Sequence, residues 1–300
     1  MIPAIDAHHH IWRQADLPWL NGPNEPRIFG DYTPIKRDYP IGEFRADLEG
    51  HGVAGSVYVQ ANWPARRAVD ESRWVQSVAD ASGWPHAIVG FADFHADDVD
   101  ETLRALAGIP RVRGVRQQLH WHENELCRFQ PRADVMNDAS WRRGFAHLRT
   151  YGLMFELQVF ASQMEDAARL AADFPETTMV LQHCGMPDDT SQAGMTAWRD
   201  GMKRLADEPN VMNKLSGLGT FIRRNDPAFI ADIVPQTVEI FGAGRCIYGS
   251  NFPIEKLWTG YGPLIGAFRR ALAGFSEADQ QSMLHGNAVR VYAPEGIEEG

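Results

Sequence analysis

The chain has 300 residues, of which 44% are hydrophobic and 23% charged, a composition typical of a folded globular protein with a large core. Its formal net charge of −10 at pH 7 speaks against binding to nucleic acid, because that affinity depends on concentrated Lys and Arg. The three cysteines lie far apart without a CxxC pair, so the sequence indicates neither a disulfide framework nor a thiolate zinc site.

Short β-like runs alternate with longer amphipathic helical segments along the chain. This alternation is typical of βα units that build a parallel sheet. In chain order, the expected strands cover residues 2–7, 56–60, 87–91, 112–118, 153–159, 178–183, 211–215 and 245–249. The helices that follow them are expected at residues 41–51, 66–82, 97–107, 140–151, 161–174, 194–207, 227–241 and 263–273.

Eight βα repeats without a break in composition, and without a GxGxxG motif, predict an α/β protein with a single (β/α)8 TIM barrel as one domain over residues 1–300. Two connections are long, residues 11–40 after the first strand and residues 119–139 after the fourth. Both follow the carboxyl ends of strands, where barrel enzymes build their active sites. We therefore expect these loops to shape a substrate site, with decoration of the surface as the alternative.

The first strand ends in three consecutive histidines. Side chains alternate along a strand, so Asp6, His8 and His10 are expected to share the face that points into the barrel, with His9 on the other face. Two imidazoles at the barrel mouth are suited to binding one cation. A tag remnant or a purely structural histidine cluster are the alternatives.

The fourth and second strands add polar groups to the same expected mouth. Alternation places Arg116, Gln118 and His120 together, a set that suits a carboxylate or a hydroxyl-rich substrate. Gln60 and Asn62 follow the second strand and add hydrogen-bonding groups. Trp12, Trp19 and Trp63 are expected either to wall the pocket or simply to pack against it.

Two charged residues are expected inside the barrel itself. Glu156 and Gln158 of the fifth strand should face the lumen, where a carboxylate is costly unless it is paired. We favour an ion pair between Glu156 and Lys214. The alternative is that Glu156 orients His8 or His10 from behind, a role for which Asp6 is also a candidate.

Four motifs, in order along the predicted strands, resemble the amidohydrolase superfamily: DAHHH at residues 6–10, LQHCG at 181–185, KLSG at 214–217 and YGSNFP at 248–253. More narrowly, the chain is similar to the amidohydrolase-related branch that contains L-fuconolactonase and 2-pyrone-4,6-dicarboxylate lactonase. The resemblance covers nearly the whole chain.

This resemblance implies a divalent cation, usually zinc, held by His8, His10, His183 and an Asp of the eighth strand that also serves as general base. Here Asn251 stands at that position, and a neutral amide is a poor base and a weaker metal ligand than a carboxylate. The lysine or carboxylate that supports a second metal on the fourth strand is absent. The cation is therefore expected to be single, or to be absent altogether as in some lactonases of the branch.

The resemblance predicts a hydrolase that opens a lactone of a sugar acid or another carboxylated metabolite, with His10, His183 and Asn251 as catalytic residues. The predicted substrate-binding residues are Arg116, Gln118, His120, Gln60, Asn62, Trp12 and Lys214. A metal-dependent decarboxylase and a non-catalytic ligand-binding barrel are the alternatives. With no signal sequence or membrane span apparent, we expect a cytoplasmic protein whose partner is a small molecule, not nucleic acid or a membrane.

Overall fold

A computed structural model describes residues 1–298 and shows eight parallel strands in one sheet, in the order β1 to β8. Their bounds are β1 Ala4–His9, β2 Val53–Val59, β3 Ala87–Gly90, β4 Val112–Val115, β5 Met154–Leu157, β6 Met179–Leu181, β7 Val211–Leu215 and β8 Cys246–Tyr248. The predicted (β/α)8 barrel is confirmed.

The ring of strands closes just beyond the end of β8. The backbone N–H of Asn251 donates to the carbonyl of His8 over 2.7 Å, and the N–H of His10 donates to the carbonyl of Phe252 over 2.7 Å. The carboxylate of Asp6 also accepts the backbone N–H of Ser250 over 2.8 Å. The seam of the barrel therefore runs through the residues that were predicted to form its site.

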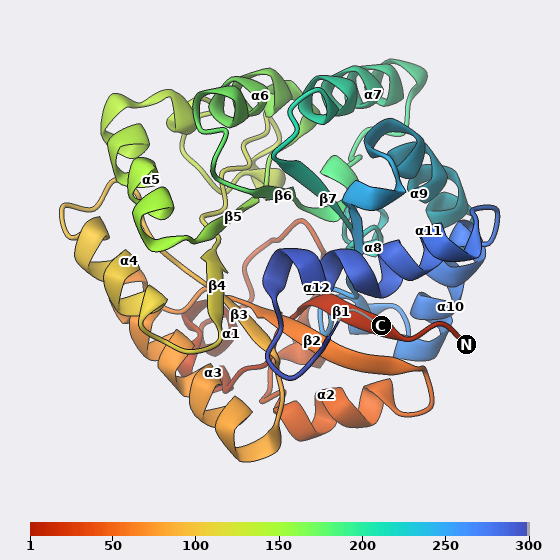
Figure 1. Ribbon diagram of the computed structural model, residues 1–300, viewed down its shortest axis with the longest axis horizontal. Coiled ribbons are helices and arrows are strands. Elements are labelled where there is room, and N and C mark those ends of the chain that lie inside the picture. The colour runs from red at the N-terminus through yellow and green to blue at the C-terminus, as the bar shows by residue number, and fades with distance from the viewer. Residues whose placement is uncertain (299–300) are drawn as a thin grey trace.

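Helices surround the strands on the outside (Figure 1). Those that follow the strands are α2 Ile41–Leu48, α3 Ala68–Ser82, α4 Val99–Ala107, α5 Ala139–Tyr151, α6 Met164–Asp173, α7 Gln192–Ala206, α9 Pro227–Phe241 and α10 Tyr261–Leu272. Two single-turn helices, α1 Pro18–Asn21 and α8 Gly219–Ile222, lie in loops at the carboxyl ends of strands. No helix of residues 1–298 is both long and apolar enough to cross a membrane.

The predicted elements agree with the structure to within about three residues at each end, and β7 and α9 have the predicted bounds. The last helical part of the chain was not predicted from the sequence. There α11 Glu277–Gln281, a π-helical turn Ser282–Gly286 and α12 Asn287–Tyr292 follow one another. This segment follows the eighth βα unit, so the repeat pattern contained no place for it.

Alternate side chains of the strands fill the barrel lumen and pack against α12, which lies near the amino-terminal ends of the strands (Figure 1). This inner cluster comprises Ile5, Ala7, Val57, Val59, Ala87, Val89, Met154, Val180, Met212, Ile247, Ala288, Val289 and Tyr292. All are almost completely buried. The lumen is therefore a packed core below the site and not a channel.

One ion pair lies inside this lumen. Lys214 Nζ is 2.6 Å and 2.8 Å from the two carboxylate oxygens of Glu156, and neither side chain is exposed. The hydroxyl of Tyr292 donates to Glu156 over 2.5 Å. Burial lowers the pKa of Lys214 to about 8, and the adjacent Glu156 opposes that shift. The predicted structural pair between Glu156 and Lys214 is confirmed.

Breaking this pair should be more harmful than replacing it. Glu156→Leu leaves an ammonium group buried without a partner, so we expect it to lower the free energy of unfolding by about 3–5 kcal/mol. Glu156→Leu combined with Lys214→Met removes both charges and should restore most of that loss. Tyr292→Phe removes a single hydrogen bond and should cost about 1 kcal/mol. Urea unfolding followed by circular dichroism measures all three, and a double variant no more stable than Glu156→Leu would contradict the prediction.

Candidate active site

A β-bulge in β1 sets the direction of its polar side chains. Asp6 pairs with Ser56 of β2 and His9 pairs with Tyr58, so three steps along β1 match two steps along β2. The expectation that Asp6 shares a face with His8 is therefore wrong. Asp6 points out of the barrel and accepts a hydrogen bond from the hydroxyl of Tyr261 on α10 over 3.1 Å.

Beyond the bulge, His8 and His10 point into the barrel mouth and meet His183, which follows β6. The ring centre of His8 lies 5.1 Å from that of His10 and 4.8 Å from that of His183. His9 points outward and stacks on Phe44 of α2, with ring centres 3.8 Å apart, as the alternation predicted. Imidazoles from two distant parts of the sequence, residues 8–10 and residue 183, therefore lie close together at the barrel mouth.

The nitrogen atoms of these rings have different partners. His10 Nδ1 lies 2.7 Å from the carbonyl of Val59, and His183 Nδ1 lies 2.9 Å from the hydroxyl of Ser216. Both nitrogens of His8 are buried without a hydrogen-bond partner. Such unpartnered nitrogens, together with outer nitrogens held by the protein, are the donor chemistry of a metal site.

The donor types of His8, His10 and His183 suit a divalent cation, but their arrangement does not, and the set has no carboxylate. Within residues 1–298, no three His, Cys, Asp or Glu side chains are arranged to hold one ion. Asn251 offers at most a neutral amide oxygen. The positive charges of Arg116 and Lys214 also act on His8 and oppose the binding of a cation. A cation would therefore bind more weakly here than in a site that includes an Asp.

All three imidazoles are neutral near neutral pH. Burial lowers the pKa of His10 to about 3, and the positive charge of Arg116 contributes to that shift. Burial, with Lys214 next in importance, holds the pKa of His8 well below its ordinary value, and burial with Arg116 does the same for His183. A neutral imidazole is the form that accepts a proton or binds a metal.

The backbone around His183 is strained. His183, Cys184, Gly185 and Met186 have φ of 55°, 53°, 69° and 54°, a left-handed run that is rare for residues with side chains. The ring of His183 also lies so close to Gly217 that a Cβ there would be 2.3 Å from its Nδ1. The fold maintains this unfavourable turn, and Gly217 leaves the space that the imidazole occupies.

Two residues that were not predicted from the sequence, Thr220 and Glu255, orient the side chain of Asn251. Thr220 contacts Asn251, and Glu255 holds Thr220. Asn251 Nδ2 lies 3.4 Å from the hydroxyl of Thr220, and the backbone N–H of Thr220 donates to Glu255 over 3.2 Å. Burial raises the pKa of Glu255 to about 8. Glu255 follows Asn251 by one turn of chain, a spacing that carries no distinctive sequence signal.

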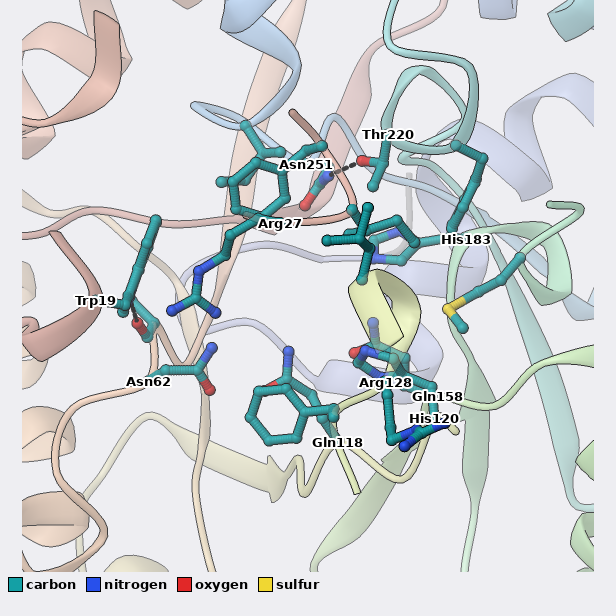
Figure 2. Close-up of a pocket in the computed structure, with 18 of the residues that line it drawn as sticks. Trp19, Arg27, Asn62, Gln118, His120, Arg128, Gln158, His183, Thr220 and Asn251 are labelled. Atoms are coloured by element: carbon teal, nitrogen blue, oxygen red, sulfur yellow. Dashed lines mark hydrogen bonds between the residues drawn. The ribbon is translucent and has the colours of Figure 1, made fainter. Parts of the chain in front are cut away.

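A cavity of about 300 Å³ opens above the imidazoles. Figure 2 shows side chains of the lining around an open space, with Asn251 and Thr220 opposite Gln118 and His120. Eight predicted site residues line the cavity: His10, Trp12, Asn62, Arg116, Gln118, His120, His183 and Asn251. Trp19, Gln158 and Thr220 also line it, and Arg27 and Arg128 join from the two long loops.

Two predicted substrate-binding residues do not line the cavity. Lys214 is buried in the lumen with Glu156, so its charge is already paired. Gln60 is also fully buried and accepts the backbone N–H of Asn62 over 2.6 Å. Gln60 was expected at the mouth from its place at the end of the second strand and Lys214 from its motif, but neither of these gives the depth of a side chain.

Arg116 is the charged group at the cavity floor. Its Nη2 donates to the carbonyl of Gln60 over 2.6 Å, and its Nε is buried without a partner. In residues 1–298 no carboxylate forms an ion pair with it, whereas Glu156 pairs with Lys214. Burial lowers the pKa of Arg116 only to about 10, so the floor carries an unbalanced positive charge.

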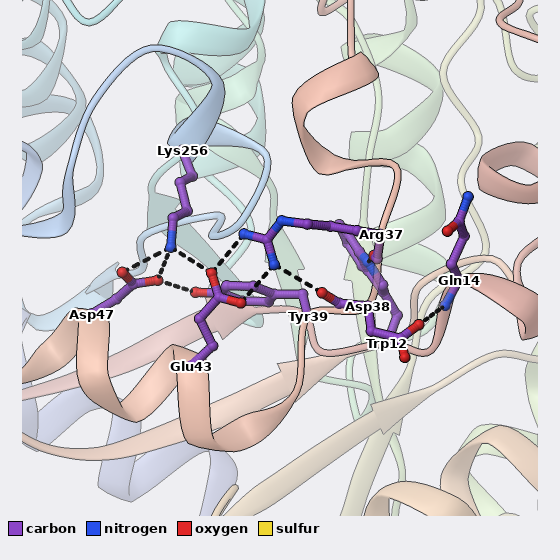
Figure 3. A network of polar contacts seen from close by, with 8 residues as sticks. All are labelled: Trp12, Gln14, Arg37, Asp38, Tyr39, Glu43, Asp47 and Lys256. Atoms are coloured by element: carbon purple, nitrogen blue, oxygen red, sulfur yellow. Dashed lines mark hydrogen bonds and ion pairs between the residues drawn. The ribbon is translucent and has the colours of Figure 1, made fainter.

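A polar network holds the first long loop above the site (Figure 3). Lys256 Nζ contacts Glu43 and Asp47 of α2 over 2.9 Å and 2.7 Å, and Arg37 binds Glu43 over 2.6 Å. The indole N–H of Trp12 donates to the carbonyl of Arg37 over 2.7 Å. The network therefore fixes the side chain of Trp12 at the cavity wall.

Comparison with known proteins gives the family. A family described as amidohydrolase matches residues 5–293. The protein belongs to this amidohydrolase family. The predicted resemblance is therefore confirmed.

Several relatives cover almost the whole of this amidohydrolase-family chain. An uncharacterized protein of Sinorhizobium fredii, y4mH, is 36% identical over 97% of this chain and 98% of its own length. The L-fucono-1,5-lactonase of Burkholderia multivorans is 28% identical over 96% of this chain and 95% of its own. The crystal structure of an amidohydrolase from Burkholderia multivorans with bound zinc superimposes with a TM-score of 0.82 at 28% identity, covering 97% of this chain and 99% of that one.

The end of β2, which carries Asn62 to the cavity, depends on a buried carboxyl group on α3. Glu71 accepts hydrogen bonds from the hydroxyl of Tyr58 over 2.7 Å and from the backbone N–H of Ala61 over 2.6 Å. Burial raises its pKa from 4.5 to about 7. The contribution of Glu71 to stability is therefore complete below about pH 4.5 and is lost as the pH rises through about 7.

Glu71→Gln should remove this pH dependence, because an amide does not ionise. We expect the Tm of the variant to rise relative to wild type as the pH increases from 4.5 to about 7, and the difference to level off above that pH. Differential scanning calorimetry across that range measures the difference. Glu239→Gln, at an exposed position of α9, controls for the loss of one negative charge. A constant difference between Glu71→Gln and wild type would contradict the assignment.

Proposed function

We propose that this amidohydrolase-family protein is a hydrolase that opens the lactone ring of a carboxylated small molecule by attack of water. The observation that carries the proposal is the unpaired guanidinium of Arg116, buried at the floor of the same cavity as His10 and His183. A buried cation without a counter-ion is costly, and a bound carboxylate would remove that cost.

Other groups at the cavity floor also lack partners. Unpartnered buried atoms include Oε1 of Gln118, Nδ1 of His120 and Oε1 of Gln158. Native proteins rarely leave such atoms unsatisfied, and where they cluster beside a cavity they are available to a ligand. The polar end of the substrate is therefore assigned to this floor, with its carboxylate against Arg116.

In the proposed reaction, water attacks the carbonyl carbon of the lactone. In the metal-free version, His10 or His183 accepts a proton from that water, the bond from the carbonyl carbon to the ring oxygen breaks, and the ring oxygen receives a proton to give a hydroxy acid. The amide of Asn251 is held by Thr220 and orients the substrate or the water, since it is not a base. A divalent cation, when bound by His8, His10 and His183, would polarise the carbonyl and lower the pKa of the water.

Acid release measured with a pH indicator, over a panel of carboxylated lactones and sugar lactones, tests the reaction. His183→Gln should lower kcat by about 10²- to 10⁴-fold, because it removes a proton acceptor. His147→Gln, at a partly exposed position of α5 outside the cavity, is the matched control and should retain full activity. Absence of acid release over the whole panel, or release of carbon dioxide from aromatic acids instead, would reject the lactonase assignment.

Arg116→Gln should act on substrate binding more than on chemistry. Loss of a charged partner for the carboxylate is expected to raise KM by about 10- to 100-fold while kcat changes less. A carboxylated lactone and its uncharged methyl ester make the comparison: only the acid should lose affinity. Equal effects on the two compounds would place the carboxylate elsewhere.

Metal content decides between the two versions of the mechanism. If the imidazoles hold a cation, wild-type protein purified without chelator should contain about one equivalent of a divalent metal, and His8→Ala should contain much less. Elemental analysis of both proteins measures this. Equal metal contents would reject the assignment of these three histidines as ligands and leave the metal-free version.

A further inference from the structure

The outer half of the cavity differs in character from its floor. The floor is built from polar side chains at strand ends, whereas the two long loops supply the outer part. Of the loop residues, Trp12, Trp19 and Phe29 come from the first loop, and Leu126 and Phe129 come from the second. The large apolar side chains of the cavity therefore lie toward its opening, where charged side chains of the same two loops also line it.

One wall is a continuous row of aromatic rings that begins at the site. The ring centre of Trp12 lies 6.4 Å from that of His10, that of Trp19 lies 5.6 Å from Trp12, and that of Phe29 lies 6.2 Å from Trp19. The indole N–H of Trp19 donates to the carbonyl of Ala61 over 2.9 Å, and that of Trp12 is likewise bound by a backbone carbonyl. With both donors occupied, this wall offers a ligand apolar ring surface.

Phe129 and Leu126 of the second long loop also line the cavity. The ring of Phe129 lies 5.4 Å from that of His120, so it continues upward from the floor. Phe129 is 43% exposed and Leu126 is 40% exposed, and in residues 1–298 the only other large hydrophobic side chain that is exposed is Met1. Both exposed positions line the cavity mouth.

The segment that carries these two side chains is fixed by hydrogen bonds. The backbone N–H of Phe129 donates to the carbonyl of His120 over 3.0 Å, and the side chain of Asn124 accepts the N–H of Leu126 over 3.1 Å. Their exposure is thus a property of a held loop. Apolar side chains held open at a cavity mouth are suited to an apolar ligand group.

Charged residues at the mouth balance one another. Arg27 and Arg128 line the opening together with Glu25 and Glu125, two positive and two negative groups. The guanidinium of Arg27 lies over the ring of Trp19, and that of Arg128 donates to backbone carbonyls of its own loop. The unbalanced charge of the cavity is therefore at the floor, on Arg116.

We propose that the substrate is amphipathic: a lactone with its carboxylate at Arg116 and an alkyl or aryl substituent between the row of Trp19 and Phe29 and the pair Leu126 and Phe129. This inference rests on the proposed function, since it names the substrate class for the same site. A hydroxyl-rich sugar lactone would place hydroxyl groups against these rings, where the indole donors are already occupied. An apolar substituent has no hydrogen bonds to lose when it contacts these rings, and the transfer of its surface out of water is favourable.

A series of carboxylated lactones with unbranched alkyl substituents of one to six carbons tests the inference. Each methylene that becomes buried is worth about 0.8 kcal/mol, which corresponds to about fourfold in affinity. We therefore expect KM to fall by two- to fourfold per methylene until the chain leaves the cavity. A hydroxylated lactone of equal size should bind more weakly than its alkyl counterpart.

The double variant Leu126→Ser and Phe129→Ser should flatten this dependence on chain length, so that KM rises far more for the longest member of the series than for the shortest. Both positions are exposed, so the fold should tolerate the change. Thr196→Ala, at an exposed position of α7 away from the cavity, is the control and should keep the full dependence. A flat series in wild type, or an unchanged slope in the double variant, would overturn the inference.

Calorimetric binding of the ring-opened hydroxy acids separates this inference from the proposed function, because binding requires no turnover. A chain-length dependence of Kd without any hydrolysis would retain the amphipathic ligand and reject the hydrolase. Hydrolysis with no dependence on chain length would retain the hydrolase and reject the amphipathic ligand. Sedimentation of the wild type and of the double variant Leu126→Ser and Phe129→Ser completes the test. If the wild type is an oligomer that the double variant dissociates, and the dependence of KM on chain length is unchanged, Leu126 and Phe129 belong to an interface between copies of the chain. That result would overturn the inference.

Discussion

The hydrogen bonds that close the barrel between β1 and the segment after β8 are the constraint on which the site depends. His8 and His10 take part through their backbones, as do Asn251 and Phe252, and the carboxylate of Asp6 holds the N–H of Ser250 from outside. Burial raises the pKa of Asp6 to about 6, so this carboxylate is ionised at neutral pH and accepts these bonds strongly. The side chains of the site therefore keep their places because their own backbones complete the barrel.

Two buried cations near this seam, Lys214 and Arg116, differ in whether a carboxylate neutralises them. Lys214 lies deeper in the lumen and is neutralised by Glu156, with Tyr292 of α12 as a further partner of the carboxylate. Arg116 lies nearer the mouth and has no carboxylate partner in the described chain. The first cation contributes to a packed core, and the second is available to an anionic ligand. This difference in depth is what separates a structural charge from a candidate binding group.

Asn251 gives the site a different electrostatic character from one with an Asp at the same position. Without that negative charge, the neighbourhood of the three imidazoles is positive, and the pKa values of His10 and His183 are lowered partly by Arg116. An anionic substrate would offset this charge when it binds. Recognition of a carboxylate and the chemistry at the imidazoles are thus coupled by electrostatics in the proposed mechanism.

Much of the fold could be predicted from local pattern. The alternation of β-like and helical segments specified eight βα units and nearly all their bounds, and the motifs at residues 6–10, 181–185 and 248–253 indicated which strand ends carry the site. Alternation of side chains also placed Arg116, Gln118 and His120 on one face, where the structure has them. These properties are local, since each depends on the periodicity of a few adjacent residues.

Tertiary structure alone decided the rest. The bulge that turns Asp6 away from His8 exists because of the register between β1 and β2, and no pattern within β1 records it. Contacts between distant segments also decide three other features. They set the depth of Lys214 and Gln60, the packing of α12 against the lumen, and the support of Asn251 by Thr220 and Glu255. The sequence by itself therefore determined the order of the elements and the types of side chain at the barrel mouth. Packing of the closed barrel decided which of these side chains reach the cavity, because their depth and the register of the strands are set by residues far away in the chain.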